Sequence, residues 1–443
     1  IITIDTPLEK SGPVFRSGPN ELSFQSFQSL HDIYKAKEDK VGKPNTWKIF
    51  SMDSSDPTIL STLDDGEHAF KHRTISTMLA PGVMRNVEQQ ILPYIATFVD
   101  RLGESDHDIQ DLCNWLSFDI ISDLLYGESF NLLQLPELRW LPEAYTAMSR
   151  WIMTCMVQPK VKLLIYLYRI VPVFQSIIKL GKWTKQRSFT RCAAGAPRDD
   201  FFTLFQQAES KHTNHSYTNK GMWTESVLLL AAGSDTTSTT MGALFFHLFR
   251  NRDALNKLTS TLRATFEHES EIVSGPELAN CVYLHACVRE AMRLVPAVPN
   301  LSPRVVRSHE LVIDGCHVPQ KTHVGVSLYS LNRDPKVFEE AEDYLPERWL
   351  STDGQRLNLE LFKSFGVGPR ACVGMNLALL ELTLVVARTL FRYDVTSPPE
   401  RVSPNGRSES EEDYCQFTFD AWAVASARRS QVNTGCFVER ASR

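Results

Sequence analysis

The chain has 443 residues, of which 43% are hydrophobic and 22% are charged, and its formal net charge is −5 at pH 7. This is an ordinary globular composition with ample apolar material for a core, and the acidic balance argues against a nucleic-acid-binding protein. The nine cysteines contain no Cys-x-x-Cys pair and no regular spacing, which favours reduced thiols in a protein that faces the cytosol.

No linker, repeat or low-complexity run divides the chain, so we expect a single domain over residues 1–443. No run of about 18 uncharged apolar residues occurs, so no membrane span is evident. Residues 151–174 and 226–249 come nearest, but both contain charged side chains. Both stretches are better interpreted as long helices of a soluble fold.

The first part of the chain predicts two strands and then a series of helices. Residues 12–16 and 20–24 look like short strands around the turn Ser17-Gly18-Pro19. A helical pattern begins at Glu67 and ends near Pro81, and residues 83–102 and 109–125 also have helical periodicity.

His68 and His72 lie one helical turn apart, so a zinc-binding pair is an alternative to plain surface histidines. No His-Glu-x-x-His order and no evident third ligand accompany them, which favours surface histidines.

The middle of the chain is helical, and one of its helices carries a local conflict. Residues 137–190 are helical and aromatic, and another short helix starts at Phe201. Within the apolar helix 226–250, Gly233 is followed by Ser234-Asp235-Thr236-Thr237. Such residues are unfavourable in a buried helix, and a conflict of this kind points to function. The alternative is a Ser/Thr-rich core helix whose hydroxyls bond their own carbonyls.

Beyond this helix, the pattern predicts another helix and a small sheet. Glu290 and Arg293 form Glu-x-x-Arg inside the helical run 283–294, which alone suggests only a surface ion pair. Residues 302–306 and 311–319 are expected to be strands of one small sheet. Residues 414–419 look like a hairpin, and residues 433–443 look like a tail.

The strongest motif is Phe-x-x-Gly-x-Arg-x-Cys-x-Gly in residues 365–374, just before an apolar helical pattern. Small residues beside Cys372 let a flat porphyrin approach, and a following helix N-terminus stabilises a thiolate. Arg370 suits a haem propionate, because a guanidinium binds a carboxylate in bidentate fashion, and Phe365 can pack against the ring. The alternative is a structural cysteine in a loop before a helix.

This loop resembles that of the cytochrome P-450 family of haem-thiolate monooxygenases, and the chain is similar to fungal microsomal members. The helix 226–250, Glu-x-x-Arg, Pro346-Glu347-Arg348-Trp349 and the cysteine loop occur in the family's order. The resemblance implies a mainly α fold with small β-sheets. It also implies that Glu290, Arg293 and Arg348 form a buried network that locks the cysteine loop.

The resemblance further implies a haem b site with Cys372 as the iron ligand. The cofactor-binding residues that it implies are Cys372, Arg370, Arg304, His68, Phe365, Gly366, Gly374 and Ala232. The family's second propionate residue is an Arg one turn after His68, but His72 stands there with Arg73 next to it. On the opposite side, Gly233 would widen the helix for dioxygen. Thr236 and Asp235 would be catalytic, the first by hydrogen bonding and the second by relaying protons.

The expected reaction is insertion of one oxygen atom from O2 into a lipophilic small molecule by hydroxylation, epoxidation or further oxidation, with secondary metabolism as the expected context. No flavin or ferredoxin domain is fused, so we expect electrons from NADPH through a flavin-containing NADPH-cytochrome P-450 reductase. We also expect an N-terminal membrane anchor, absent from this chain, that holds the full-length protein at the cytosolic face of the endoplasmic reticulum. A naturally soluble enzyme is the alternative. Residues 151–174 are expected to touch lipid headgroups.

Three other functions remain open at this point. A haem-thiolate isomerase or dehydratase needs no O2, a peroxide-using relative needs no reductase, and a non-catalytic haem-binding protein needs no substrate. The Asp235-Thr236 pair argues against all three, because their chemistry does not require an acid beside an alcohol.

Overall fold

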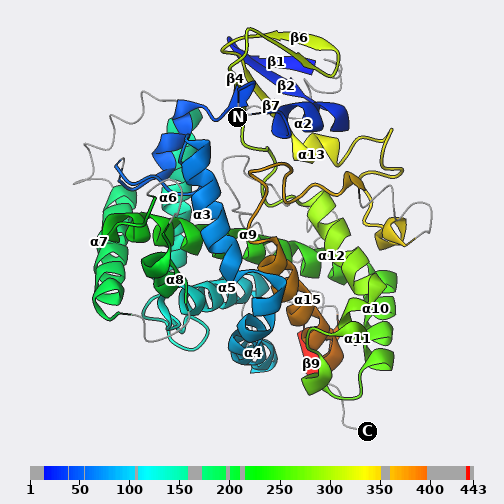
Figure 1. Cartoon of the computed structure of the whole chain (residues 1–443). Helices are drawn as coiled ribbons and strands as arrows, with labels where there is room; N and C mark the ends of the chain where they lie inside the picture. The colour runs from blue at the N-terminus through cyan, green and yellow to red at the C-terminus, as the bar shows by residue number, and fades with distance from the viewer. Residues whose placement is uncertain are drawn as a thin grey trace.

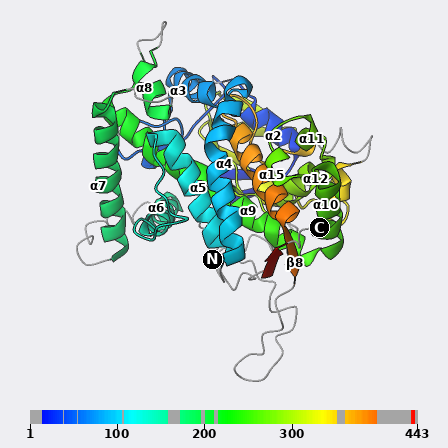
Figure 2. The same cartoon turned by 90° about the horizontal axis from the view of Figure 1, so that it is seen from below.

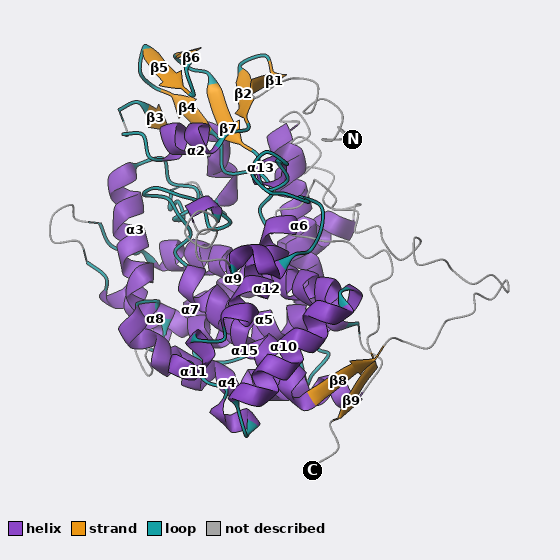
Figure 3. Ribbon diagram, turned by 90° about the vertical axis from the view of Figure 1, so that its right-hand side faces the viewer, coloured by secondary structure: helices purple, strands orange, loops and turns teal. Residues whose placement is uncertain are grey.

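The computed structural model describes residues 14–37, 39–53, 55–104, 108–157, 172–195, 200–209, 215–350, 360–396 and 436–439. Helices form the body of the molecule, and a small sheet lies at one end of it (Figures 1 and 3). The expected mainly helical fold with small sheets is therefore confirmed.

The sheet at this end joins the start of the described chain to segments far along the sequence. Its strands, in spatial order, are β1 (Val14–Gly18), β2 (Glu21–Phe24), β7 (His323–Val326), β4 (Arg304–Val306) and β3 (Val41–Gly42). β1 and β2 pair antiparallel, as their strand patterns predict, whereas β2 and β7 pair in parallel. The parallel pairing holds the first strands of the chain against its second half.

Two further strand expectations are corrected by the structure. Residues 302–306 and 311–319 do not share a sheet, because β5 (Glu310–Ile313) and β6 (Cys316–Pro319) form a separate hairpin. Its turn residues Asp314 and Gly315 both have positive φ, which matches the twist of a tight hairpin. The expected tail contains β9 (Cys436–Glu439), which pairs antiparallel with β8 (Tyr393–Thr396). The hairpin expected at 414–419 lies outside the described residues.

The helices before the centre of the chain begin and end close to their predicted positions. α3 (Asp65–Met78) follows Asp64, whose carboxylate accepts the backbone N–H of Glu67 at 2.6 Å. α4 (Pro81–Glu104) and α5 (Ile109–Tyr126) come next, and Asp108 caps α5 through the N–H of Gln110.

The central helix is α9 (Asn219–Arg250), which packs against α5, α12 (Val282–Leu294) and α15 (Met375–Arg392) (Figures 1 and 2). It runs unbroken through Gly233, so the expected widening there is not seen. A Cβ at Gly233 would lie 2.9 Å from Ile121 Cδ1 of α5. The glycine therefore allows the two helices to approach closely.

The aromatic helical region consists of α6 (Trp140–Val157) and α7 (Pro172–Ala193), followed by α8 (Phe201–Gln207), which Asp200 caps. Residues 158–171, most of the segment expected to touch lipid, lie outside the described residues. Among the helices in the described ranges, none combines the length and the apolar character that crossing a membrane requires.

The remaining elements are α2 (Phe27–Tyr34), α10 (Arg252–Thr265), α11 (Pro276–Ala279), α13 (Leu328–Leu331) and the 3-10 turns η1 (Asn45–Phe50), η3 (Glu269–Glu271) and η4 (Pro346–Trp349). The main core lies where α4, α5, α9 and α15 meet, and a smaller core lies under the sheet. Phe365 and Val373 pack on the first core, and Val367 packs on the second. The cysteine loop therefore lies between the two cores.

Candidate functional site

The cysteine loop folds back on itself before α15 begins. The backbone N–H of Cys372 donates to the carbonyl of Phe365 at 2.8 Å. Gly366 and Gly368 have φ angles of 73° and 80°, a conformation that favours glycine. Gly374 is the N-cap of α15. Cys372 is therefore presented by a tight turn at the start of a long helix.

The Cys372 side chain is surrounded by protein, although it is not closed off from solvent. Solvent reaches its side chain, yet burial raises the pKa of the thiol above its usual value. A hydrogen bond from the backbone N–H of Gly374 opposes that rise by stabilising the thiolate. A Cβ at Gly374 would lie 3.8 Å from the Cys372 Sγ, so the glycine keeps the space beside the sulfur free.

Two other contacts hold the loop in place. The Phe365 ring packs edge-on against Phe362, with 6.2 Å between ring centroids. Gly368 lies so close to the backbone carbonyl of Tyr34 in α2 that a Cβ would overlap that oxygen. The loop is thus fixed to both the helical core and the helix beneath the sheet.

Asp235 and Thr236 lie near the middle of α9, on a stretch that solvent reaches although the helix crosses the centre of the molecule. Ala232, one turn before Thr236, is exposed, and the Thr236 hydroxyl donates to its carbonyl at 2.7 Å. Burial raises the pKa of Asp235 well above its usual value, and only Arg150 opposes the shift. Burial therefore favours the protonated form of Asp235.

The structure supports part of the alternative interpretation of α9, a Ser/Thr-rich core helix whose hydroxyls bond its own carbonyls. Ser234, Thr236, Ser238 and Thr240 all donate to carbonyls of the preceding turn of α9. This accounts for their hydroxyls but not for Asp235. Within the described chain, no direct contact joins Asp235 or Thr236 to Cys372. Their relative positions are set by the packing of α9 against α15, the helix that begins just after Cys372.

The three residues expected at the propionates are brought together by α3, β4 and the cysteine loop. Arg370 donates to Asp65 Oδ1 at 2.7 Å. Arg304 is buried, donates to the carbonyl of Ser302 at 2.9 Å and lies over the Tyr34 ring. His68 is also buried, so its interpretation as a plain surface histidine is wrong. Burial, Arg370, His72 and Lys43 lower the pKa of His68 to about 3, so its imidazole is neutral.

A pocket of about 320 Å³ opens beside this group. Its lining residues are Asp65, His68, Ala69, His72, Arg73, Ser76, Pro369 and Arg370. Cys372 is not among them, so the pocket belongs to the charged group and not to the thiol.

Comparison with known proteins shows the family. The model of the cytochrome P450 family matches residues 9–411 of the chain. The chain belongs to the cytochrome P450 family.

Similar curated proteins are fungal members of this family. Cytochrome P450 monooxygenase atnE of Emericella nidulans is 27% identical over 417 residues, which cover 88% of this chain and 80% of the relative. For apf7 of Gibberella fujikuroi the identity is 28%, with 86% and 78% covered. For BOA3 of Botryotinia fuckeliana it is 29%, with 92% and 82% covered.

The P450 family implies a haem-thiolate cofactor, and the residues present fit one. The Cys372 thiol is reached by solvent, and the neighbouring Gly374 has no side chain to stand beside the sulfur. The buried basic side chains of Lys43 and Arg304 lie nearby and have too few acidic partners. Two haem propionates would supply the missing negative charge. Among the described residues, no three His, Cys, Asp or Glu side chains gather as a metal site, so the zinc alternative finds no third ligand there.

The expected network behind the cysteine loop of this P450 is confirmed. Both oxygens of the fully buried Glu290 accept from Arg293, at 2.9 and 3.0 Å. Arg348 Nε and the Trp349 indole N–H also donate to Glu290, at 3.0 and 2.9 Å. The carboxylate therefore joins α12 to η4, which precedes the loop.

Sequence reasoning missed two polar groups of this P450. Lys43 and Asp65 lie among the propionate candidates, where Asp65 binds Arg370 and Lys43 lowers the pKa of His68. A lone Lys after a strand and an Asp at a helix start are ordinary surface patterns in a sequence. The position of Lys43 near Arg304 becomes evident from the pairing of β3 with β4.

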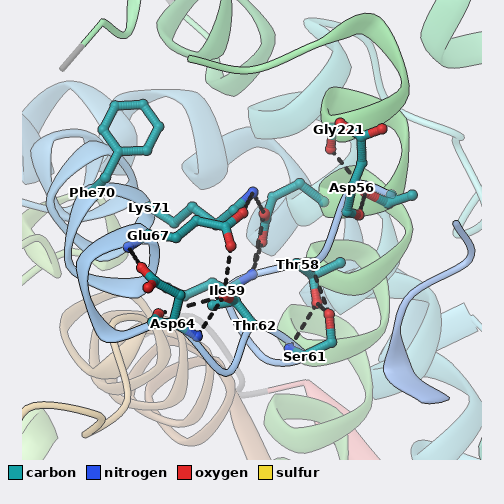
Figure 4. Close-up of polar contacts among 12 residues, drawn as sticks. Asp56, Thr58, Ile59, Ser61, Thr62, Asp64, Glu67, Phe70, Lys71 and Gly221 are labelled. Atoms are coloured by element: carbon teal, nitrogen blue, oxygen red, sulfur yellow. Dashed lines mark hydrogen bonds and ion pairs between the residues drawn. The ribbon is translucent and has the colours of Figure 1, made fainter. Parts of the chain in front are cut away.

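A second missed group ties α3 to α9 (Figure 4). The fully buried Glu225 accepts from Lys71 Nζ at 3.1 Å and from the backbone N–H of Ile59 at 2.9 Å. Glu67, one turn before Lys71, accepts from the Thr62 hydroxyl at 2.6 Å. The loop before α3, α3 itself and α9 are thus joined by polar contacts at one place.

Proposed function

We propose that this P450 is a haem-thiolate monooxygenase that inserts one oxygen atom from O2 into a lipophilic small molecule. Hydroxylation, epoxidation and further oxidation are the reactions that this chemistry includes. The observation that carries the proposal is Cys372, held on a glycine turn at the start of α15 with Gly374 N–H bonded to its sulfur. Fungal relatives named as monooxygenases support it.

In this proposal the chain's own residues bind and orient the haem. Cys372 is the iron ligand, Phe365, Gly366 and Gly374 line its side of the ring, and Ala232 lines the other. Arg370 and Arg304 bind the propionates by charge-assisted hydrogen bonds. His68, which is neutral, contributes an N–H or an acceptor and no charge. The haem, when bound, supplies the activation of dioxygen.

Asp235 and Thr236 move protons to the reacting oxygen in this proposal. Burial raises the pKa of Asp235 and so favours its protonated form, which can act as a proton donor. The Thr236 hydroxyl bonds the Ala232 carbonyl with its proton and keeps its lone pairs free to accept one. A proton passed from Asp235 to Thr236 would let Thr236 give up its own.

The remaining parts of the proposal concern context. We infer one catalytic domain over residues 1–443, and electrons from NADPH through a separate flavin-containing reductase. We also infer anchoring of the full-length protein at the cytosolic face of the endoplasmic reticulum, and a role in secondary metabolism. The acidic net charge supports the absence of a nucleic-acid partner.

Optical spectroscopy of the purified protein tests the haem assignment. We expect the ferrous–CO spectrum of a thiolate-ligated haem, and its loss in Cys372→Ser. A Cys316→Ser variant, which removes another exposed thiol, is the control and should keep the spectrum. A normal thiolate spectrum in Cys372→Ser would refute the ligand.

Oxygen uptake with NADPH and reductase tests the proton relay, once a substrate is found by its shift of the Soret band. Thr236→Ala should lower product per NADPH severalfold and release hydrogen peroxide, because proton delivery then fails. Thr240→Ala, one turn along α9, removes a hydroxyl that bonds only its own helix and should stay coupled. Unchanged coupling in Thr236→Ala would exclude the relay.

A further inference from the structure

Lys43 is a buried lysine that follows β3 by one residue, and its side chain points into the group of propionate candidates. It is only 6% exposed. In the ladder between β3 and β4, Val41 pairs with Val306 and Gly42 pairs with Val305. The same register, continued by one residue, sets Lys43 opposite Arg304. Like charges directly opposite each other destabilise a pair of strands, so this pairing needs a neutralising group.

The described residues do not provide that group. Lys43 Nζ donates to the carbonyl of Leu60 and lies 4.6 Å from the centre of the Trp47 ring, and both partners are uncharged. Asp65 is the acid whose charge raises the pKa of Lys43, but it already forms ion pairs with Arg370 at 2.7 Å and Arg307 at 3.5 Å. No ion pair of Lys43 occurs within the part of the chain that the structure describes.

The electrostatic consequences are large. Burial, Arg370 and Arg304 lower the pKa of Lys43 to about 6, and burial lowers the pKa of Arg304 to about 10. Both side chains are thus held away from water without an anion of their own, so the charged form of each is costly, and that of Lys43 is disfavoured at neutral pH, unless an anion is bound.

The balance of charge indicates what the anion is. Lys43, Arg304, Arg370 and Arg307 are basic side chains, and the acid among them is Asp65, which Arg370 and Arg307 share. Positive charge is therefore in excess here when Lys43 is protonated, which suits the carboxylates of a haem. On α3, His72 stands where the family resemblance predicts an arginine.

We propose that Lys43 binds a haem propionate, as the third cation beside Arg304 and Arg370. This inference rests on the proposed haem-thiolate function. Lys43 therefore supplies from the sheet the positive charge that α3 lacks at position 72.

The test uses the holoenzyme and two readouts besides activity. Lys43→Met removes charge and donor, Lys43→Gln keeps a donor for the Leu60 carbonyl, and Lys43→Arg keeps the charge. Lys48→Met is the matched control, because Lys48 is an exposed lysine in the adjacent η1. The readouts are the rate of haem transfer to excess apomyoglobin and the propionate-bending band in the resonance Raman spectrum.

We expect Lys43→Met and Lys43→Gln to lose haem about tenfold faster and to shift the propionate band, since each lacks a charge-assisted bond. Lys43→Arg should retain both properties within about twofold of the parent, and Lys48→Met should be unchanged. If Lys43→Gln keeps the parent's band and haem-loss rate, the propionate role is refuted and Lys43 serves only the Leu60 carbonyl. A parent protein without a thiolate-haem spectrum would instead refute the proposed function itself.

Discussion

Glu381 illustrates at the scale of one residue how burial alone sets an ionisation state. It lies in α15, its side chain is buried among core residues, and its Oε2 has no hydrogen-bond partner in the described chain. Burial raises the pKa of Glu381 well above its usual value, and no neighbouring cation opposes the shift. Burial therefore favours the protonated carboxyl in the folded protein.

This state predicts that Glu381→Gln stabilises the protein, increasingly so as the pH rises. In the unfolded chain Glu381 loses its proton above about pH 4.5, whereas the folded protein holds the proton to a higher pH. Unfolding then releases a proton, so the parent loses stability as pH rises above the unfolded value. Glutamine has no such proton to lose.

Thermal unfolding of the holoenzyme at pH 5 and pH 8 measures the effect. The gain in midpoint for Glu381→Gln over the parent should be small at pH 5 and reach a few degrees at pH 8, or about 1–3 kcal/mol. Glu267→Gln, at an exposed glutamate, should show no such pH-dependent gain. A gain at pH 5 equal to that at pH 8 would mean that Glu381 is not the titrating group.

How well single residues could be predicted depended on whether a motif surrounds them. Cys372, Arg370 and the pair Asp235-Thr236 could be singled out because their neighbours in sequence define their chemistry. Lys43 and Glu381 could not, because their environments come from strand pairing and helix packing. No pattern of nearby residues reports such tertiary burial.

At the scale of elements, Glu290 joins α12 to η4 through bonds that leave no water around its carboxylate. Arg293 and Arg348 neutralise it, and Arg293 also donates to the carbonyls of Asn332 and Ala341. Removing Arg293 takes two hydrogen bonds from the buried carboxylate and leaves the Asn332 and Ala341 carbonyls without this donor, which costs far more than breaking an exposed pair.

We therefore predict that Arg293→Ala destabilises the protein by about 3–5 kcal/mol and lowers haem incorporation during expression. Lys257→Ala breaks the 2.7 Å ion pair between Lys257 and Glu347. Both of these side chains are half exposed, so the loss of stability should be less than about 1 kcal/mol. Thermal unfolding and the haem-to-protein ratio are the measurements. Equal losses in the two variants would show that the buried network adds nothing beyond a surface pair.

Element positions were predicted better than element partners. The strands at 14–24 and the helices from α3 to α5 follow periodicity and capping residues such as Asp64 and Asp108. The division of residues 302–319 between two sheets and the strand at 436–439 depend on partners far along the chain. Sequence patterns indicate that a strand forms, but not which edge it joins.

At the scale of the whole molecule, one buried ion pair connects the first third of the chain to its centre. Lys71 of α3 and Glu225 of α9 are 3.1 Å apart, and both side chains are buried. Glu225 also accepts the Ile59 N–H from the loop before α3, and Lys71 lies 4.4 Å from the centre of the Tyr217 ring. The pair thus orients α3, which carries His68, relative to α9, which carries Asp235 and Thr236.

A double-mutant cycle of Lys71→Met and Glu225→Gln tests whether this pair couples the two helices. Each single change leaves one buried charge, and once Glu225 is neutral, the acid that the described residues still offer Lys71 is Glu67 at 3.8 Å. The double variant leaves neither charge, and the amide oxygen introduced by Glu225→Gln would keep an acceptor for the Ile59 N–H. We expect the double variant to be more stable, by about 1–3 kcal/mol, than the sum of the single effects.

The matched control is an exposed ion pair between α9 and the segment that precedes α3. Lys220 of α9 and Asp53 of the loop before α3 lie 3.3 Å apart, but their side chains are 53% and 27% exposed. Its cycle should give a coupling below about 1 kcal/mol, because water screens and replaces the interaction. If both cycles give the same coupling, burial does not strengthen the tie. The relative position of α3 and α9 must then come from apolar packing, and the propionate and proton-relay residues are aligned without help from the ion pair.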